Sequence, residues 1–133
     1  FFVIMEKSQA DLEKGQMDKF LATSLQKIVK DAPGKKNARL RESCTSTLEL
    51  VKNFGVIPKS SKREHIEQAD KVTNKLIITL KLACESRQSR IMSSALDCLE
   101  KLMSYGYIRP SIKDIENPDS KLMDKVIDII GDC

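Results

Sequence analysis

The residues of this chain that could take part in catalysis or metal binding begin with four cysteines, Cys44, Cys84, Cys98 and Cys133. None belongs to a C-x-x-C pair, and structural zinc sites need closely spaced pairs of Cys, or of Cys and His. The spacing therefore argues against zinc. Cys44, Cys84 and Cys98 lie among apolar residues at helical spacing, which predicts buried free thiols in a protein of a reducing compartment.

A nucleophilic active site of the Ser-His-Asp or Cys-His kind would have to use His65, the single histidine. It lies at an expected loop-to-helix junction beside Arg63 and Glu64, where a surface histidine is far commoner than a general base. Asp128 and Asp132 are four residues apart, but such acid pairs usually lie on a solvated helix face, and no cleft is implied. The five glycines are isolated, so no phosphate-binding loop can be placed. The sequence predicts no catalytic, cofactor-binding or metal site.

The basic residues offer a different chemistry, contact with anionic groups. The net charge is mildly basic, at +4, and two clusters stand out. No aromatic residues interleave them, unlike the pattern of many nucleic-acid binders. A basic domain that binds nucleic acid or anionic membrane is the alternative interpretation. We favour a weak contact with anionic lipid or an acidic protein surface, and expect no nucleic-acid partner. The clusters are Lys27, Lys30, Lys35, Lys36, Arg39 and Arg41, and then Lys59, Lys62 and Arg63.

The composition indicates what kind of element positions these side chains. The chain has 133 residues, of which 41% are hydrophobic and 5% aromatic, with no Trp, five Gly and four Pro. A sandwich or barrel of many short strands needs more turn, aromatic and β-branched residues. A single α-helical domain built on aliphatic residues is therefore expected.

Apolar residues recur at helical spacing through most of the chain. The stripe on the longest expected helix exceeds half its circumference, so that helix should be covered on more than one side. This pattern fits a compact bundle or an α-solenoid of about five or six helices. The expected helices are 17–31, 35–54, 64–86, 88–105 and 119–130, with a basic loop over 55–63 and an N-terminal extension or short helix over 1–16, interrupted at Gly15.

The same periodicity predicts which side chains form the core. On the helix over 88–105, the inward residues should pack against those of the helix over 64–86. The last helix should also turn an apolar stripe inward. The expected core residues are Ile91, Ala95, Leu99 and Leu102 against Leu76, Leu80 and Ala83, and then Leu122, Met123, Val126, Ile127 and Ile130.

One stretch, LACESRQSRIMSSALDCLEKLMSYGYI over 82–108, resembles a known family. It is similar to the N-terminal dimerisation and cyclophilin-binding domain of the large brefeldin-A-inhibited guanine-nucleotide exchange factors for Arf GTPases. The segments FLATSLQKI over 20–28, ADK over 69–71 and KLMDKVI over 121–127 agree with it. The resemblance covers roughly residues 17–133.

The resemblance implies an armadillo- or HEAT-like α-solenoid, with residues 17–133 forming a helical-repeat regulatory domain of a longer protein. It implies no catalysis and no cofactor here, because nucleotide exchange in that family belongs to a separate domain. It also implies self-association, or contact with a neighbouring regulatory domain of the same protein. The implied partner is an Arf-like small GTPase in its GTP form. The implied location is cytoplasmic, peripheral to the trans-Golgi membrane.

A partner surface is expected on the outward face of the helix over 88–105. At 100° per residue, Lys101, Ser104 and Tyr105 fall opposite the core stripe, and Ile108 would join them if the helix continued past Gly106. Tyr is enriched at interface centres, so these four residues form a candidate contact for the GTPase. The alternative is that Tyr105 packs against the turn that follows.

Overall fold

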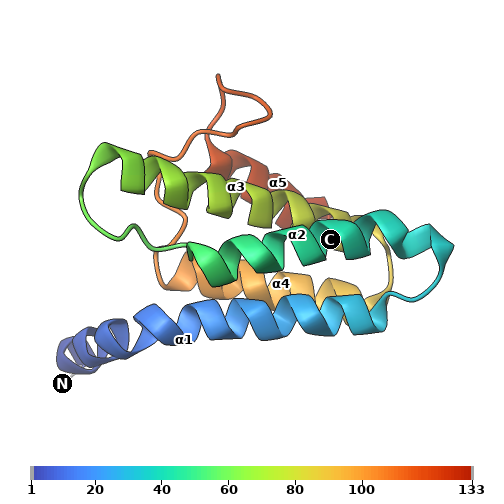
Figure 1. The fold of residues 1–133 in the computed structure, drawn as a ribbon, viewed down its shortest axis with the longest axis horizontal. Helices are drawn as coiled ribbons and strands as arrows, with labels where there is room; N and C mark the ends of the chain where they lie inside the picture. The colour runs from blue at the N-terminus through green and yellow to red at the C-terminus, as the bar shows by residue number, and fades with distance from the viewer. Residues whose placement is uncertain (1, 133) are drawn as a thin grey trace.

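The computed structural model describes residues 2–132, and the side chains of residues 16–132. In that part of the chain every regular element is helical, apart from one isolated β-bridge between Lys113 and Lys121. The all-α fold class is therefore confirmed. In chain order the elements are α1 (Phe2–Asp31), the short 3-10 helix η1 (Lys35–Asn37), α2 (Ala38–Asn53), α3 (Arg63–Glu85), α4 (Ser89–Ser104) and α5 (Leu122–Asp132) (Figure 1).

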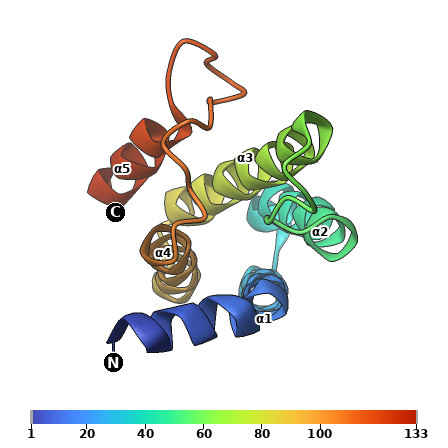
Figure 2. The ribbon, with the colours of Figure 1, turned by 90° about the vertical axis from the view of Figure 1, so that its left-hand side faces the viewer.

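Consecutive helices from α1 to α4 run antiparallel and form two stacked pairs (Figures 1 and 2). α1 packs on α2 within the first pair, and α3 packs on α4 within the second. The pairs join through contacts of α1 with α4 and of α2 with α3, and α5 adds to the stack against α3. This order of helix pairs is compatible with a short helical solenoid.

The first helix is longer than the sequence pattern indicated. α1 runs without interruption through Gly15, where a break was expected. A single glycine costs a helix about 1 kcal/mol relative to alanine, and without a following proline or cap it does not end the helix. Of the expected N-terminal extension over 1–16, the side chains of residues 1–15 lie outside the described part, as does Cys133.

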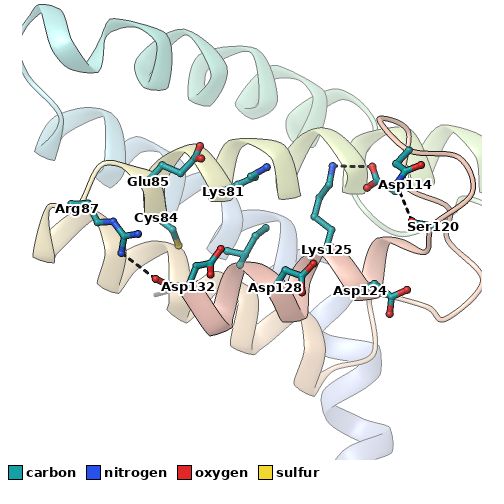
Figure 3. Close-up of a pocket in the computed structure, with 12 residues that line it drawn as sticks. Lys81, Cys84, Glu85, Arg87, Asp114, Ser120, Asp124, Lys125, Asp128 and Asp132 are labelled. Carbon is teal, nitrogen blue, oxygen red and sulfur yellow. Dashed lines mark hydrogen bonds and ion pairs between the residues drawn. The ribbon is translucent and has the colours of Figure 1, made fainter.

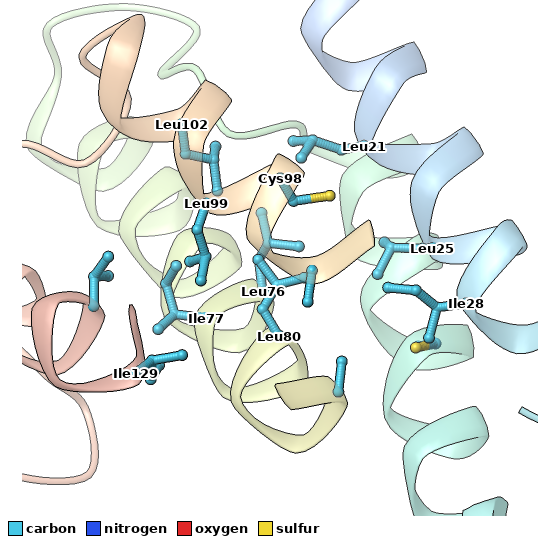
Figure 4. Close-up of a cluster of buried hydrophobic side chains, with 14 of the residues drawn as sticks. Leu21, Leu25, Ile28, Leu76, Ile77, Leu80, Cys98, Leu99, Leu102 and Ile129 are labelled. Atoms are coloured by element: carbon cyan, nitrogen blue, oxygen red, sulfur yellow. The ribbon is translucent and has the colours of Figure 1, made fainter. Parts of the chain in front are cut away.

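The core lies between α1, α3 and α4, with α2 and α5 closing its sides (Figure 4). Its centre is formed by aliphatic side chains that α1, α3 and α4 each contribute at helical spacing. Because α3 contacts α2, α4 and α5, its broad apolar stripe is covered on several sides, as the sequence predicted. The fully buried residues include every expected one from the two central helices, Ile91, Ala95, Leu99, Leu102, Leu76, Leu80 and Ala83.

Buried hydroxyl groups join α2 to α3 inside this otherwise apolar layer. Thr79 Oγ1 lies 2.6 Å from Ser43 Oγ and 2.7 Å from Thr47 Oγ1. It also donates to the Lys75 carbonyl at 3.0 Å, a partner within its own helix. Each hydroxyl therefore has a hydrogen-bond partner, which removes the penalty of burying it.

On α5 the expected inward stripe is partly wrong. Leu122, Val126 and Ile129 are buried, whereas Ile127 is 55% exposed and Ile130 is also exposed. Two apolar stripes overlap on this helix, offset by one residue, and helical periodicity alone cannot choose between them. The packing of α5 against α3 selects the stripe that ends at Ile129.

Candidate partner-binding surfaces

The expected partner residues lie at the C-terminal end of α4, on the surface of the stack. Lys101 is half-buried, Ser104 is exposed, and Tyr105 is 43% exposed. Met103, on the same helix turn, is a further exposed apolar side chain that the sequence pattern did not single out. Its place one residue from the Leu102 core position gives no periodic signal of exposure.

Ile108 does not belong to this surface, which corrects the expectation. The Gly106 N–H donates to the Met103 carbonyl at 3.1 Å, and the Tyr107 N–H donates to the Leu102 carbonyl at 2.9 Å. With Gly106 at a φ of 74°, these two bonds close α4 in a Schellman motif. The reversal turns the chain back towards the core, so that Ile108 is only 3% exposed.

The loop between α4 and α5 is attached to α3 by a buried amide. Asn74 accepts a hydrogen bond from the Ile115 amide at 2.9 Å and donates to the Lys113 carbonyl at 3.0 Å. An ion pair between Arg109 and Asp70 holds the start of the loop. These contacts fix the backbone of a segment that contains no regular helix, while Ile115 itself remains 54% exposed.

A buried ion pair attaches the same loop to α5. Lys125 Nζ lies 2.8 Å from Asp114 Oδ1, with side-chain exposures of 12% and 5%. Burial alone would raise the pKa of Asp114, but hydrogen bonds from Lys125 and the Glu116 amide hold it below its ordinary value. Burial opposes the charge of Lys125 too, yet its carboxylate partners raise its pKa. Both groups are therefore charged at neutral pH.

A cleft of ≈ 400 Å³ separates α3 from α5 (Figure 3). Asp128 and Asp132 line it, so the expectation that no cleft adjoins this acid pair is wrong. Lys81 and Lys125 bring positive charge to the same cleft, and Arg87 donates to the Asp132 carbonyl at 3.1 Å. The charges that line the cleft are therefore mixed.

The other candidate residues are spread over the surface. His65 is half-buried and shares a hydrogen bond of 2.6 Å with Ser60.

Among the described residues, no group of three or more His, Cys, Asp or Glu side chains could hold a metal ion. No helix in the described range is both long and apolar enough to span a bilayer. Cys44 and Cys98 are buried thiols, and burial raises their pKa to about 12 and about 11.

Part of the first basic cluster has a structural role. Arg41 donates to the Ala32 carbonyl at 2.7 Å and to the Gly34 carbonyl at 2.6 Å, which satisfies backbone acceptors after the end of α1. Its positive charge also lies close to the negative end of the α1 dipole. The remaining cluster members are exposed, namely Lys27, Lys30, Lys35, Lys36 and Arg39, as are Lys59, Lys62 and Arg63 of the second cluster.

Comparison with known proteins shows the family to which this chain is similar. The model of the family described as "DCB: Mon2/Sec7/BIG1-like, dimerisation and cyclophilin-binding domain" matches residues 13–133. The chain is 33% identical over 131 residues to "Brefeldin A-inhibited guanine nucleotide-exchange protein 1" of Rattus norvegicus, which covers 86% of this chain and 7% of that protein.

More distant relatives agree. Identity is 27% with "Brefeldin A-inhibited guanine nucleotide-exchange protein 2" of Arabidopsis thaliana, covering 97% of this chain and 8% of that protein. It is 28% with "ADP-ribosylation factor guanine nucleotide-exchange factor SEC7" of Saccharomyces cerevisiae, covering 84% and 6%. The chain thus spans a small fraction of the length of these relatives. No solved structure gives a significant match.

Proposed function

This chain belongs to the Mon2/Sec7/BIG1-like dimerisation and cyclophilin-binding domain family, and we propose that it is a non-catalytic regulatory domain of a large Arf guanine-nucleotide exchange factor. Its roles in that protein are self-association and the binding of partner proteins, including a cyclophilin. The observation that carries the proposal is the family match over residues 13–133, joined to an all-helical stack of the kind that serves as a binding scaffold.

The partner that we propose for the end of α4 is an Arf-like small GTPase in its GTP form. Lys101, Ser104 and Tyr105 lie there at helical spacings of three and four residues. An exposed aromatic ring close to a basic side chain suits the centre of a protein interface. Binding there would recruit the exchange factor to the cytoplasmic face of the trans-Golgi, as a peripheral protein.

This contact is tested with the double variant Lys101→Asp and Tyr105→Ala. Both side chains lie outside the buried core, so helicity and melting temperature should stay nearly unchanged. Capture by immobilised GTP-loaded Arf-like protein should fall by at least about tenfold, because the variant removes an aromatic contact and reverses a charge. GDP-loaded protein serves as the nucleotide control.

A matched control is available at the C-terminal end of a different helix, α2. Lys52→Asp with Phe54→Ala removes a basic and an aromatic side chain, and Phe54 is 42% exposed, close to the 43% of Tyr105. The control should retain binding. Undiminished capture of the Lys101 and Tyr105 variant would place the interface elsewhere, on α1 or the basic turn over 35–41, and would contradict the proposed contact.

A further inference from the structure

The chain contains four prolines, and the peptide bonds that precede them lie in different structural environments. The four X-Pro bonds are Ala32–Pro33, Ile57–Pro58, Arg109–Pro110 and Asn117–Pro118. Cyclophilins are prolyl isomerases, so the segment that one of them recognises contains an X-Pro bond. Such an enzyme must close around the bond, and both residues, together with their neighbours, must be reachable from solvent.

We propose that the Asn117–Pro118 peptide bond is the site at which a cyclophilin binds this domain. This inference rests on the proposed function, since cyclophilin binding enters through the family to which the chain belongs. It adds the segment of the chain that the partner contacts and the chemical group that it recognises.

Two of the other bonds are held by contacts with the helix stack, although Pro33 itself is exposed. Ala32 is fully buried, and its carbonyl oxygen, the oxygen of the X-Pro amide itself, accepts a hydrogen bond from Arg41. The Pro33 carbonyl is also occupied, by Asn37 at 2.9 Å. Ile57 and Pro58 are both half-buried, and Ile57 packs against the core. An isomerase that bound either bond would have to displace these contacts.

The third bond is held on its N-terminal side. Arg109 is half-buried and forms an ion pair with Asp70 of α3. Its carbonyl oxygen accepts from the Ile112 amide at 3.1 Å, and the Ile112 side chain is buried. Binding at Pro110 would therefore require the loop to detach from α3.

The Asn117 carbonyl also accepts a hydrogen bond within a turn, but the Asn117–Pro118 bond differs from all three in the exposure of the residues around it. The five consecutive residues from Ile115 to Asp119 are exposed. They lie on the part of the loop that projects beyond α3 in both views of the ribbon (Figures 1 and 2). The exposed Ile115, two residues before the bond, offers an apolar side chain next to the proline.

The bond belongs to a tight turn whose residues Asn117, Pro118 and Asp119 are exposed. The Ser120 amide donates to the Asn117 carbonyl at 2.8 Å, which makes proline the second residue of a four-residue turn, and Asn117 also donates to Ser120 Oγ at 3.0 Å. On its outer sides Asn74 and Lys125 hold the loop to the stack. The segment is therefore presented to solvent while its ends are anchored to the stack.

The test measures binding of a recombinant single-domain cyclophilin to the full 133-residue chain by calorimetry. Three variants are compared, Pro118→Ala, Pro33→Ala and Pro110→Ala. We expect Pro118→Ala to raise the Kd at least about tenfold, because proline is the recognised residue, and the other two to stay within about twofold of wild type. All three prolines are exposed, so thermal melts should show each variant folded.

A second measurement does not depend on a substitution. In the wild-type chain, amide NMR signals of residues 115–120 should shift or broaden when cyclophilin is added, before those around Pro33 or Pro110. Equal Kd values for Pro118→Ala and wild type, or signals that move elsewhere, would overturn this inference and leave the proposed function standing. A wild-type chain that binds no cyclophilin would overturn this inference and the cyclophilin part of the proposed function.

Discussion

Gly55 occupies a position, directly after the end of α2, that other residues cannot fill without strain. Its φ is 73°, in the left-handed region. A Cβ at this residue would lie 2.6 Å from Asp18 Oδ2 of α1, while Asp18 Oδ1 accepts a hydrogen bond from the Val56 amide at 3.4 Å. The glycine thus allows the α2–α3 loop to approach α1 closely.

We expect Gly55→Ala to lower the free energy of unfolding by about 2–4 kcal/mol, the sum of the left-handed backbone penalty and the displacement of the Asp18 carboxylate. Urea denaturation followed by circular dichroism measures it. Gly106→Ala is the matched control, since Gly106 has a φ of 74° and no atom within 4 Å of the added Cβ. It should lose about 1–2 kcal/mol, from the backbone alone. Equal losses at the two positions would show that Asp18 gives way at no cost.

At the scale of elements, the loop between α4 and α5 is held in place although it contains no regular helix. Besides the hydrogen bonds within the loop, polar side chains of α3 and α5 hold it, chiefly Asn74 and Lys125. Asn74 is bonded to residues 39 and 41 positions away, and Lys125 to one 11 positions away, and both side chains are buried or nearly so. The attachment of α5 to the stack therefore depends on electrostatics as well as on its apolar stripe.

We expect the Asp114–Lys125 pair to make stability fall in acid. The pKa of Asp114 is lower in the folded chain than its ordinary 3.8, so the unfolded chain takes up the proton first as pH falls. The contribution is complete above about pH 5 and is lost as pH falls through the lowered folded pKa. Because the pKa of Lys125 is raised above its ordinary 10.5, that side loses its contribution only in strong alkali.

The measurement is the free energy of unfolding between pH 7 and pH 3 for wild type and Asp114→Asn. The variant should be less stable at pH 7 by about 1–3 kcal/mol, because Lys125 loses its charged partner, and the two curves should converge at low pH. Glu116→Gln provides a control that changes the exposed partner of the same lysine and should have a smaller effect. Parallel curves over the whole range would contradict the role of Asp114.

At the scale of the whole molecule, stability depends on one continuous core. Leu99 is fully buried within a cluster that includes residues of every α-helix from α1 to α5. A carboxylate at this position would have no charged partner inside that cluster, and burying an unpaired charge costs more than one helix interface can offset.

We expect Leu99→Asp to remove at least about 4–5 kcal/mol, a large part of the stability of a domain of this size, and so to unfold the chain or nearly so. Thermal denaturation followed by circular dichroism measures it, and Leu99→Met, which preserves volume, should lose less than about 1.5 kcal/mol. A soluble, fully helical Leu99→Asp chain with an unchanged melting temperature would refute this core.

Local pattern in the sequence determined the helices and most of their inward faces. The recurrence of apolar residues located α2, α3 and α4 and identified Leu76, Leu80 and Leu99 as core. The same pattern, with the low turn and aromatic content, determined the all-α class. These features depend on intervals of three and four residues, which the chain displays directly.

Tertiary structure alone decided the features that depend on distant partners. Periodicity allowed either stripe of α5, and contact with α3 chose Ile129 over Ile127. The burial of Ile108 depends on the chain reversal at Gly106, and the ordered loop depends on Asn74, about forty residues earlier in the sequence. A polar residue that is satisfied only by a remote group carries no mark of its burial in the sequence around it, because its partner is supplied by the fold.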